Sequence, residues 1–331
     1  MILRRFAVTT ASIGSLFFAA LAGYSQVRLE IRTVNTQTLR TQQILKGERL
    51  GTPTVIAGEL RIPPGEGRLP AVVLLHGSGG LGSAQQQWAA DLNAIGIAVF
   101  LLDSFSARGI TSTVNDQTQL DHLAMMVDAY RALGLLTQHP RIDPNRIAVM
   151  GWSKGALAAV YASMERFRRS YAPPNIEFQA HIGLFTPCNT RYTDEQKTTG
   201  KPIRLFHGTA DDYVAIGPCR EYVRRLKMVG VDIDLTEYSG AHHSYDTPRP
   251  NGEPLQFPQG STTRNCSMIE AEDGVVLNAA THKPFSYSDA CVERGPHIGY
   301  DEAATRETKR AVTAFLIARF RLGSTSPAPG R

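Results

Sequence analysis

A glycine-flanked serine at the end of an apolar strand constrains the fold of this chain more than any other feature. The segment reads Arg146-Ile-Ala-Val-Met-Gly-Trp-Ser-Lys-Gly155, and helix-forming residues follow it to position 164. Glycines at 151 and 155 remove Cβ atoms that would block a tight strand-to-helix turn. Ser153 would sit at the tip of this turn, in front of a helix N-terminus. The alternative is an ordinary turn serine, because three fixed positions also arise by chance.

Strand and helix patterns alternate along the rest of the chain. Continuous apolar runs such as Pro70–Leu75 are typical of strands that helices cover on both faces. The pattern predicts an α/β fold with a mostly parallel central sheet flanked by helices, in one domain of residues 23–323. The expected strands are Thr54–Ile62, Pro70–Leu75, Ile97–Asp103, Arg146–Gly151, Ala180–Phe185, Pro202–Phe206 and Val231–Tyr238, and the expected helices are 84–94, 118–138, 154–168, 218–229 and 302–321.

The two ends of the chain differ from this domain. Arg4 and Arg5 precede the apolar run Phe6–Ala22, which ends in the cleavage pattern Ala-Leu-Ala. We therefore expect a signal peptide at residues 1–22 and a protein exported to the periplasm or secreted. The run is short and contains Thr and Ser, which makes an uncleaved anchor less favoured, and the motif around the paired arginines fits twin-arginine export poorly. The Ser/Pro/Gly-rich tail, 324–331, is expected to be disordered.

The net charge argues against nucleic acid as a partner. The formal charge is +5, and removal of Arg4 and Arg5 with the signal peptide lowers it to +3. No block of basic residues suited to a phosphate backbone remains. We expect no stable membrane insertion after the signal peptide is removed, and the oligomeric state is left open.

Four cysteines form an even set in a chain that we expect to reach an oxidising compartment. Cys188 follows one predicted strand, and Cys219 follows the turn after the next strand. Of the three possible pairings we favour Cys188 with Cys219 and Cys266 with Cys291. Four buried free thiols are the alternative.

Residues 245–300 interrupt the alternation of strands and helices. They are rich in Pro, Gly, Ser, Thr and Asn, and they contain Cys266 and Cys291. A long insertion in a compact domain usually has a purpose. One interpretation is a disulfide-tied cap or rim beside the active site, and the other is a surface excursion that the disulfide only stabilises.

A serine nucleophile needs a base, an orienting acid and donors for the oxyanion, and the chain offers a candidate for each. His76-Gly-Ser-Gly-Gly80 follows a predicted strand, so the backbone amide of Ser78 is one candidate oxyanion donor. The amide of Lys154, the residue after the nucleophile, is the other. A plain glycine-rich turn is the alternative for residues 76–80.

The acid and the base are expected after two further strands. Asp211 has the G-x-x-D spacing of the acid, with the neighbouring Asp212 as the alternative. His243 is the candidate base, and His242 is expected to pack or to face water. The order Ser153, Asp211, His243 is that of α/β-hydrolases. Arg108, Trp152 and Tyr213 lie near the motif ends and are weaker candidates for substrate contact.

At these motifs the chain resembles the dienelactone hydrolase family of α/β-hydrolases. The resemblance covers roughly residues 50–245 and the last helix, and it also includes Asp103-Ser-Phe-Ser-Ala-Arg-Gly109. It implies hydrolysis of a small-molecule ester or lactone without a cofactor. The chain departs from the founding members, which have cysteine where this chain has Ser153, and residues 245–300 have no counterpart in the minimal fold.

Other functions fit the sequence less well. An exported peptidase or polyester hydrolase could use the same three residues, and a non-catalytic binding protein could keep the same fold. The histidines and cysteines lack compact metal-ligand spacing, so no metal site is predicted. No G-x-G-x-x-G phosphate loop opens a helix after a first strand, so no nucleotide cofactor is predicted.

Overall fold

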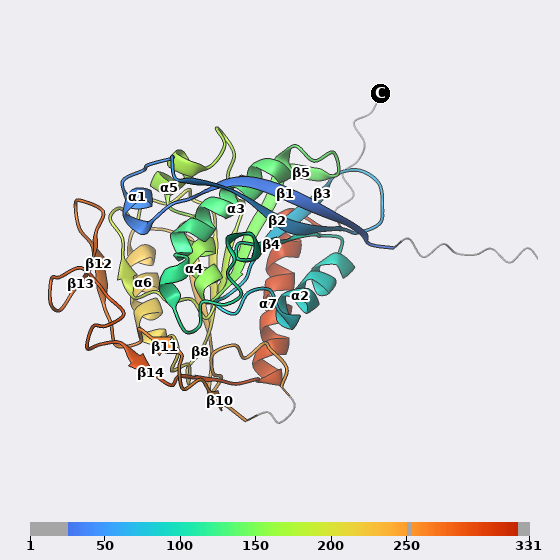
Figure 1. Ribbon diagram of the computed structural model, residues 1–331. Coiled ribbons are helices and arrows are strands. Elements are labelled where there is room, and N and C mark those ends of the chain that lie inside the picture. Colours follow the sequence, from blue (N-terminus) through green and yellow to red (C-terminus); the bar gives the residue numbers. More distant parts are fainter. Residues whose placement is uncertain (1–25, 250–252, 324–331) are drawn as a thin grey trace, which may run out of the picture.

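The computed structural model describes residues 26–249 and 253–323 (Figure 1). The predicted signal peptide at 1–22 and the predicted tail at 324–331 lie outside the described residues.

An eight-stranded sheet forms the centre of the molecule, in the order β1-β2-β4-β3-β5-β6-β8-β9. The strands from β4 to β9 in this order run parallel to one another, and the antiparallel pair β1–β2 extends one edge. The predicted mostly parallel sheet is therefore confirmed. The strands are β1 (Arg28–Thr38), β2 (Thr52–Ile62), β3 (Leu69–Leu75), β4 (Ala98–Asp103), β5 (Ile142–Trp152), β6 (His181–Leu184), β8 (Ile203–Gly208) and β9 (Ile233–Tyr238).

Helices cover both faces of this sheet and create two hydrophobic cores. In β3, Val73 and Leu75 point into one core, whereas Val72 and Leu74 point into the other. The first core is completed by α3 (His122–Thr137), α4 (Lys154–Tyr161), α5 (Glu165–Tyr171) and α6 (Ile216–Met228). The second is completed by α2 (Ser83–Ala94) and α7 (Glu302–Phe320), which lie side by side in Figure 1 and are joined by the Lys309–Asp91 ion pair.

Two elements differ from the sequence-based expectation. The pattern at 154–168 predicts one helix, but the chain breaks between α4 and α5, where Met164 forms a β-bridge with Thr198 and the Glu165 amide donates to the Lys197 carbonyl. Strand β1 was not expected. It is an edge strand with Leu29 and Ile31 exposed, so it lacks the apolar run that marks a buried strand.

The insertion consists of very short strands tied together by side chains and a disulfide. The strands are β10 (Leu255–Gln256), β11 (Ser261–Thr262), β12 (Met268–Glu270), β13 (Val276–Asn278), β14 (Glu293–Arg294) and β15 (His297–Ile298), and β12 pairs with β7 (Thr190–Arg191). Strands this short give no readable period in the sequence. The remaining short elements of the chain are α1 (Thr41–Leu45), η1 (Ser106–Arg108) and η2 (Gln117–Gln119).

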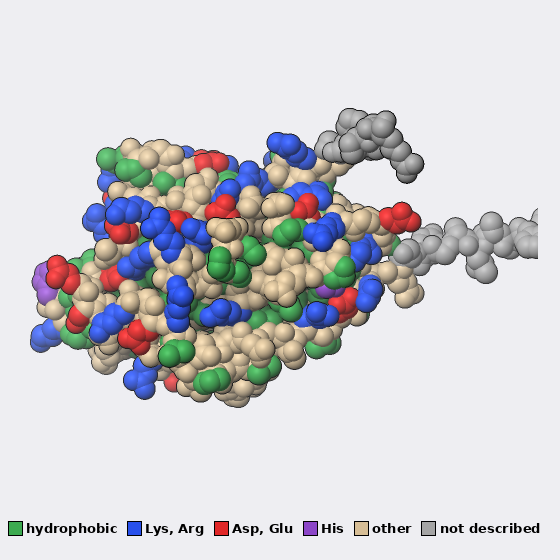
Figure 2. Space-filling view, turned by 90° about the horizontal axis from the view of Figure 1, so that it is seen from above, with side chains coloured by type: hydrophobic (Ala, Val, Ile, Leu, Met, Phe, Trp, Pro, Cys, Tyr) green, Lys and Arg blue, Asp and Glu red, His purple; other side chains and the backbone are tan. Residues whose placement is uncertain are grey.

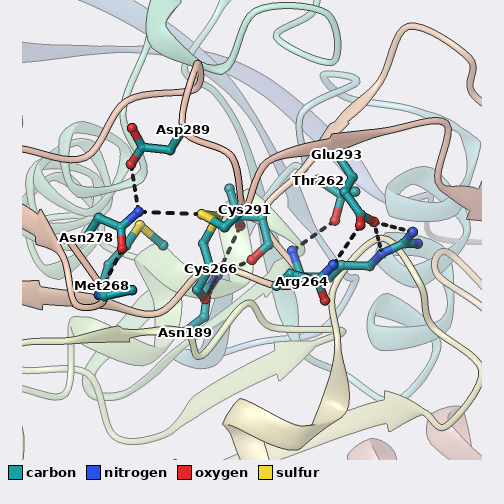
Figure 3. The surroundings of a disulfide bond; sticks show 12 residues. Asn189, Thr262, Arg264, Cys266, Met268, Asn278, Asp289, Cys291 and Glu293 are labelled. Carbon is teal, nitrogen blue, oxygen red and sulfur yellow. Dashed lines mark hydrogen bonds and ion pairs between the residues drawn. A yellow bond between two sulfur atoms is a disulfide. The ribbon is translucent and has the colours of Figure 1, made fainter.

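Both predicted disulfides are present. Cys188 is bonded to Cys219, and Cys266 is bonded to Cys291. Figure 3 shows the second bond, with Asn278 and Asp289 on one side and the Arg264–Glu293 ion pair on the other. The insertion is thus disulfide-tied and precedes the last helix, as predicted.

The surface carries charges of both signs. On the face seen in Figure 2, Lys and Arg side chains are scattered among Asp and Glu. In the described part of the chain, no helix combines the length and the apolar character needed to cross a bilayer.

Candidate active site

Ser153 occupies a strained turn between β5 and α4. Its backbone angles are φ 51° and ψ −113°, a conformation that a residue with a side chain rarely adopts. A Cβ on Gly151 would lie 2.1 Å from the Gly155 carbonyl oxygen, and one on Gly155 would lie 2.3 Å from the Leu75 carbonyl oxygen. The glycines of this motif are therefore needed for the close packing of α4 on β3 and β5.

The turn lies where the order of the sheet reverses. Strand β3 has β4 on one side and β5 on the other, so the carboxyl ends of β3 and β5 border a topological switch point. The turn after β3 packs against the serine, since a Cβ on Gly77 would lie 3.6 Å from Ser153 Cβ. The Ser153 amide donates to the Leu184 carbonyl of β6 at 3.0 Å.

Asp211 lies in the turn after β8 and contacts His243, which follows β9. The distance between His243 Nδ1 and Asp211 Oδ2 is 2.8 Å, while Asp211 Oδ1 accepts from the amides of Tyr213 (3.0 Å) and Val214 (2.7 Å). A carboxylate only accepts hydrogen bonds, so Nδ1 of His243 carries the hydrogen and Nε2 is left as an acceptor.

The charge state of Asp211 follows from these contacts. Burial alone would raise the pKa of this carboxyl, but the nearby His243 imidazole and hydrogen bonds from His207 and His243 hold the pKa well below its usual range. His207 Nε2 lies 3.3 Å from Asp211 Oδ2. Asp211 is therefore a buried carboxylate that stays charged at neutral pH.

Two contacts connect the histidine loop to the serine turn. The His243 ring packs on Phe185, which follows Leu184, the acceptor for the Ser153 amide; the ring centroids are 4.7 Å apart. Trp152 Nε1 donates to Asp246 at 2.7 Å. Within the described residues, no hydrogen bond joins Ser153 Oγ to His243. Such contacts are often long in unliganded enzymes and shorten when substrate binds.

The two candidate oxyanion donors have backbone amides without acceptors. In residues 26–249 and 253–323, neither the Ser78 amide nor the Lys154 amide donates a hydrogen bond to the protein. Both residues line the same cavity as Ser153. An amide that faces a cavity without a partner is available for the oxygen of a bound carbonyl.

The side chains of Ser78 and Lys154 meet at Gln117, a residue that sequence reasoning missed. Ser78 Oγ donates to Gln117 Oε1 at 3.0 Å, and Lys154 Nζ donates to the carbonyls of Gln117 (3.1 Å) and Leu120 (2.6 Å). Burial lowers the pKa of Lys154 to about 8, although Asp121 and Asp116 act against this shift. The loop that contains η2 thus connects both oxyanion candidates, and no sequence motif marks it.

Asp212, the alternative acid, binds the insertion. Its Oδ1 accepts from the His297 amide and its Oδ2 lies next to His297 Nδ1, each at 2.8 Å. Arg264 donates to the Asp212 carbonyl at 2.8 Å, and Thr262 Oγ1 donates to the Tyr213 carbonyl at 2.7 Å. The two neighbouring carboxylates therefore have different partners. Asp211 contacts His243, and Asp212 contacts the insertion.

The cavity in front of Ser153 has a volume of about 1210 Å³. Its wall includes Ser153 and Tyr213 from the main domain, and Thr262, Phe285 and Tyr287 from the insertion. The Gly299 amide also donates to the His243 carbonyl at 3.0 Å. The insertion therefore borders the cavity and contacts the histidine loop.

The weaker candidates for substrate contact separate into two groups. Tyr213 lines the cavity, and its ring lies 4.8 Å from that of His243. Arg108 is not among the residues that line this cavity; its guanidinium pairs with Asp128 at 2.8 Å and donates to Thr38 Oγ1 at 2.8 Å. Trp152 is buried and points to Asp246. Arg108 and Trp152 therefore act in packing.

Several known proteins are similar to this chain in sequence or in structure. A probable 2-oxo-3-(5-oxofuran-2-ylidene)propanoate lactonase of Bradyrhizobium sp is 23% identical over 198 residues, which are 54% of this chain and 74% of that protein. A dienelactone hydrolase-like promiscuous phosphotriesterase from metagenomic libraries is 18% identical with a TM-score of 0.54, covering 89% of this chain and 98% of its own. A propionate-bound thermophilic esterase of Thermogutta terrifontis is 17% identical with a TM-score of 0.51, and the match covers 81% of this chain and 92% of that esterase.

The family itself follows from a match along most of the chain. The model of the dienelactone hydrolase family matches residues 56–319, which include the serine turn, both carboxylates, the histidine loop and α7 as far as Arg319. This chain belongs to the dienelactone hydrolase family and is a hydrolase that acts on ester bonds.

Proposed function

We propose that this protein hydrolyses carboxylic esters or lactones through an acyl-enzyme on Ser153, with His243 as the base and Asp211 as the acid that orients it. The observation that carries the proposal is the 2.8 Å contact between His243 Nδ1 and Asp211 Oδ2, which leaves Nε2 free to accept a proton. Support also comes from the strained turn at Ser153 and from the amides of Ser78 and Lys154, which have no acceptor among the residues that the structure describes.

The proposed reaction has two steps. In the first, Ser153 Oγ attacks the carbonyl carbon while His243 Nε2 takes its proton, and the amides of Ser78 and Lys154 hold the oxyanion. The bond to the alcohol then breaks, and the alcohol leaves with the proton from His243. In the second step, His243 takes a proton from water, the hydroxide adds to the acyl carbon, and the acid leaves as Ser153 Oγ recovers the proton.

A fluorophosphonate probe tests this proposal. It forms a stable phosphonyl ester only with an activated serine. We expect mass spectrometry of the labelled protein to place the adduct at Ser153. Labelling should be absent in Ser153→Ala and retained in Ser288→Ala, which changes an exposed serine of the insertion. A folded wild-type protein that takes no label, or takes it elsewhere, contradicts the proposal.

Two further proposals concern the insertion and the location of the protein. We propose that residues 245–300 form a cap over the active site, because several of them line the cavity that Ser153 lines. We also propose that the protein is exported, for which the disulfides Cys188–Cys219 and Cys266–Cys291 are support, since such bonds persist in oxidising compartments. Cell fractionation of the full chain, with a variant that lacks residues 2–22, checks the second proposal.

A further inference from the structure

The cavity is larger than a simple short-chain ester requires. Its volume of about 1210 Å³ exceeds the roughly 300–1,000 Å³ typical of pockets for drug-sized ligands. An acetyl group with a small alcohol would leave most of this space to water. The size therefore indicates a substrate with at least one bulky moiety.

Most residues that line the cavity carry neutral hydrogen-bonding groups. Hydroxyl and amide side chains come from β2, from the η2 loop, from the segment after β6, and from the insertion. Such a wall suits a substrate with many hydroxyl groups, because each buried hydroxyl needs a partner. Examples are Thr52, Gln117, Gln119, Asn189, Ser261 and Ser286. The amides of Gln117, Gln119 and Asn189 and the hydroxyl of Ser286 already bond to neighbouring protein groups, but each retains capacity for a further hydrogen bond.

The cavity has few titratable side chains, and most of them are bonded to neighbouring groups of the protein. Lys154 Nζ is bonded to the carbonyls of Gln117 and Leu120, and His122 Nε2 lies 2.9 Å from the Tyr192 hydroxyl. Asp121 lies beside His122, with 3.4 Å between Oδ1 and Nδ1. Arg40 is exposed to solvent, where screening weakens its attraction for an anion. The cavity is therefore suited to an uncharged substrate.

An aromatic pair on the insertion lies at the cavity, with its two rings edge to face at an interplanar angle of 70°. Phe285 and Tyr287 both line it, and their ring centroids are 5.4 Å apart. Tyr287 remains 38% exposed, which is high for a large aromatic side chain in a folded protein. Sugar rings present C–H groups that pack on the electron-rich face of such rings while their hydroxyls bond to neighbouring polar groups.

Leu157 provides an apolar surface next to the serine, and other apolar side chains of the cavity, such as Met268 and Val276, come from the insertion. Leu157 follows Ser153 by one helical turn in α4, and both line the cavity. The acyl group is joined to Ser153 in the proposed intermediate, so it must fit beside Leu157. The alcohol part of the ester then extends toward the polar and aromatic wall.

From these observations we infer that the substrate is a short-chain ester of a neutral carbohydrate, whose sugar part packs on the exposed ring of Tyr287. This inference rests on the proposed function at Ser153. In the reaction, the sugar hydroxyl is the leaving alcohol, and water supplies the hydroxyl of the released acid.

The test compares three acetate esters with one another and with one long-chain ester. The substrates are a neutral acetylated xylo-oligosaccharide, ethyl acetate and 4-nitrophenyl acetate, with 4-nitrophenyl octanoate as a long-chain ester. We expect kcat/KM for the oligosaccharide acetate to exceed that for ethyl acetate by at least about tenfold. In Tyr287→Ala the ratio of these two values should fall by about tenfold, whereas Tyr287→Phe, which keeps the ring, should preserve it.

The outcomes distinguish this inference from the proposed function. If Ser153 takes the fluorophosphonate and 4-nitrophenyl acetate is cleaved, but the oligosaccharide acetate is no better than ethyl acetate, the inference is wrong and the proposed function stands. Preference for the octanoate over the acetates, or an unchanged ratio in a folded Tyr287→Ala, also overturns it. If 4-nitrophenyl acetate is not cleaved and Ser153 is not labelled, the proposed function itself fails.

Discussion

At the residue scale, Asp211 and Asp212 show how neighbouring carboxylates take on different tasks. Asp211 is buried and contacts His243 and His207, whereas Asp212 is partly exposed and contacts His297 and Arg264. The difference follows from their direction at the end of β8: one side chain points toward the histidine loop and the other toward the insertion. The G-x-x-D spacing predicts Asp211 as the acid with Asp212 as the alternative, and the contact of Asp211 with His243 supports the proposal of Asp211.

Asp211→Asn is expected to lower kcat for 4-nitrophenyl acetate by about 10⁴-fold, because the amide cannot stabilise the imidazolium or fix its tautomer. The control is Asp212→Asn, which keeps the Asp211–His243 pair and should lose far less kcat. Steady-state kinetics on both purified variants gives the comparison. A larger kcat loss in Asp212→Asn than in Asp211→Asn would show that the assignment of the acid is wrong.

The burial of Lys154 leads to a separate prediction about how the free energy of unfolding depends on pH. Burial lowers its pKa in the folded protein to about 8, against an ordinary value of 10.5. At this position the unfolded chain therefore binds more protons between these two values, and the contribution of Lys154 to the free energy of unfolding rises with pH across this window. Below about pH 8 the amine is charged in both states and its burial penalty is fully present.

Lys154→Met has no titrating group at this position and should lack the rise. We expect the difference in unfolding free energy, wild type minus Lys154→Met, to shift in favour of wild type by about 3 kcal/mol between pH 7 and pH 10.5. Urea unfolding at both pH values measures it, and other titrating groups cancel in the difference. A constant difference would mean that the pKa of the buried amine is not lowered.

At the element scale, the turn between β5 and α4 depends on the absence of side chains. A Cβ on Gly155 would lie 2.3 Å from the Leu75 carbonyl oxygen and 2.4 Å from that of His76, so α4 would have to move away from β3. The matched position is Gly217 in α6, where an added Cβ has open space. The same substitution therefore tests packing at one glycine and helix propensity at the other.

Gly155→Ala is expected to lower the free energy of unfolding by about 1–3 kcal/mol and to reduce kcat, because Ser153 moves with the helix. Gly217→Ala should change stability by less than about 1 kcal/mol and leave kcat unchanged, because its Cβ has open space and the following Pro218 offsets the helix preference of alanine. Thermal unfolding and steady-state kinetics measure both effects. Equal behaviour of the two variants would contradict the role of Gly155 in close packing.

Individual elements show which parts of the fold could be predicted. Strand β3 could be predicted because both of its faces are buried, so every residue from 70 to 75 is apolar. Strand β1 could not, because Leu29 and Ile31 face solvent while Val34 faces the core, and this weak pattern resembles a polar loop. The break after Tyr161 depends on pairing of Met164 with the distant Thr198, which local propensity does not contain.

The same distinction applies to the candidate site. The motifs around Ser153, Asp211 and His243 lie at strand ends, where local sequence determines the turn. Gln117 could not be found in this way, because its contact with Ser78 depends on the path of a long loop. The contact of Asp212 with His297 joins residues that are far apart in sequence, and only the folded insertion brings them together.

At the scale of the whole molecule, the two disulfides stabilise different parts of the structure. Cys188 and Cys219 are buried in the main core, where they link the segment after β6 to α6. Cys266 and Cys291 join two parts of the insertion, near the β11–β14 pair and the Arg264–Glu293 ion pair. Their sequence separations are similar, 31 and 25 residues, so chain entropy alone predicts similar effects of about 3–4 kcal/mol.

Because the two disulfides lie in different parts of the structure, we expect their removal to have different effects. The double substitution Cys266→Ala/Cys291→Ala should loosen the insertion locally, so that amide exchange within residues 255–298 accelerates by about a hundredfold while the core stays protected. Because Phe285 and Tyr287 lie between these cysteines, KM for bulky esters should rise more than KM for 4-nitrophenyl acetate. Cys188→Ala/Cys219→Ala should instead lower the global unfolding midpoint. Hydrogen exchange and thermal unfolding of both variants distinguish the two cases, and a global loss of protection in Cys266→Ala/Cys291→Ala would show that the insertion is part of the main folding unit.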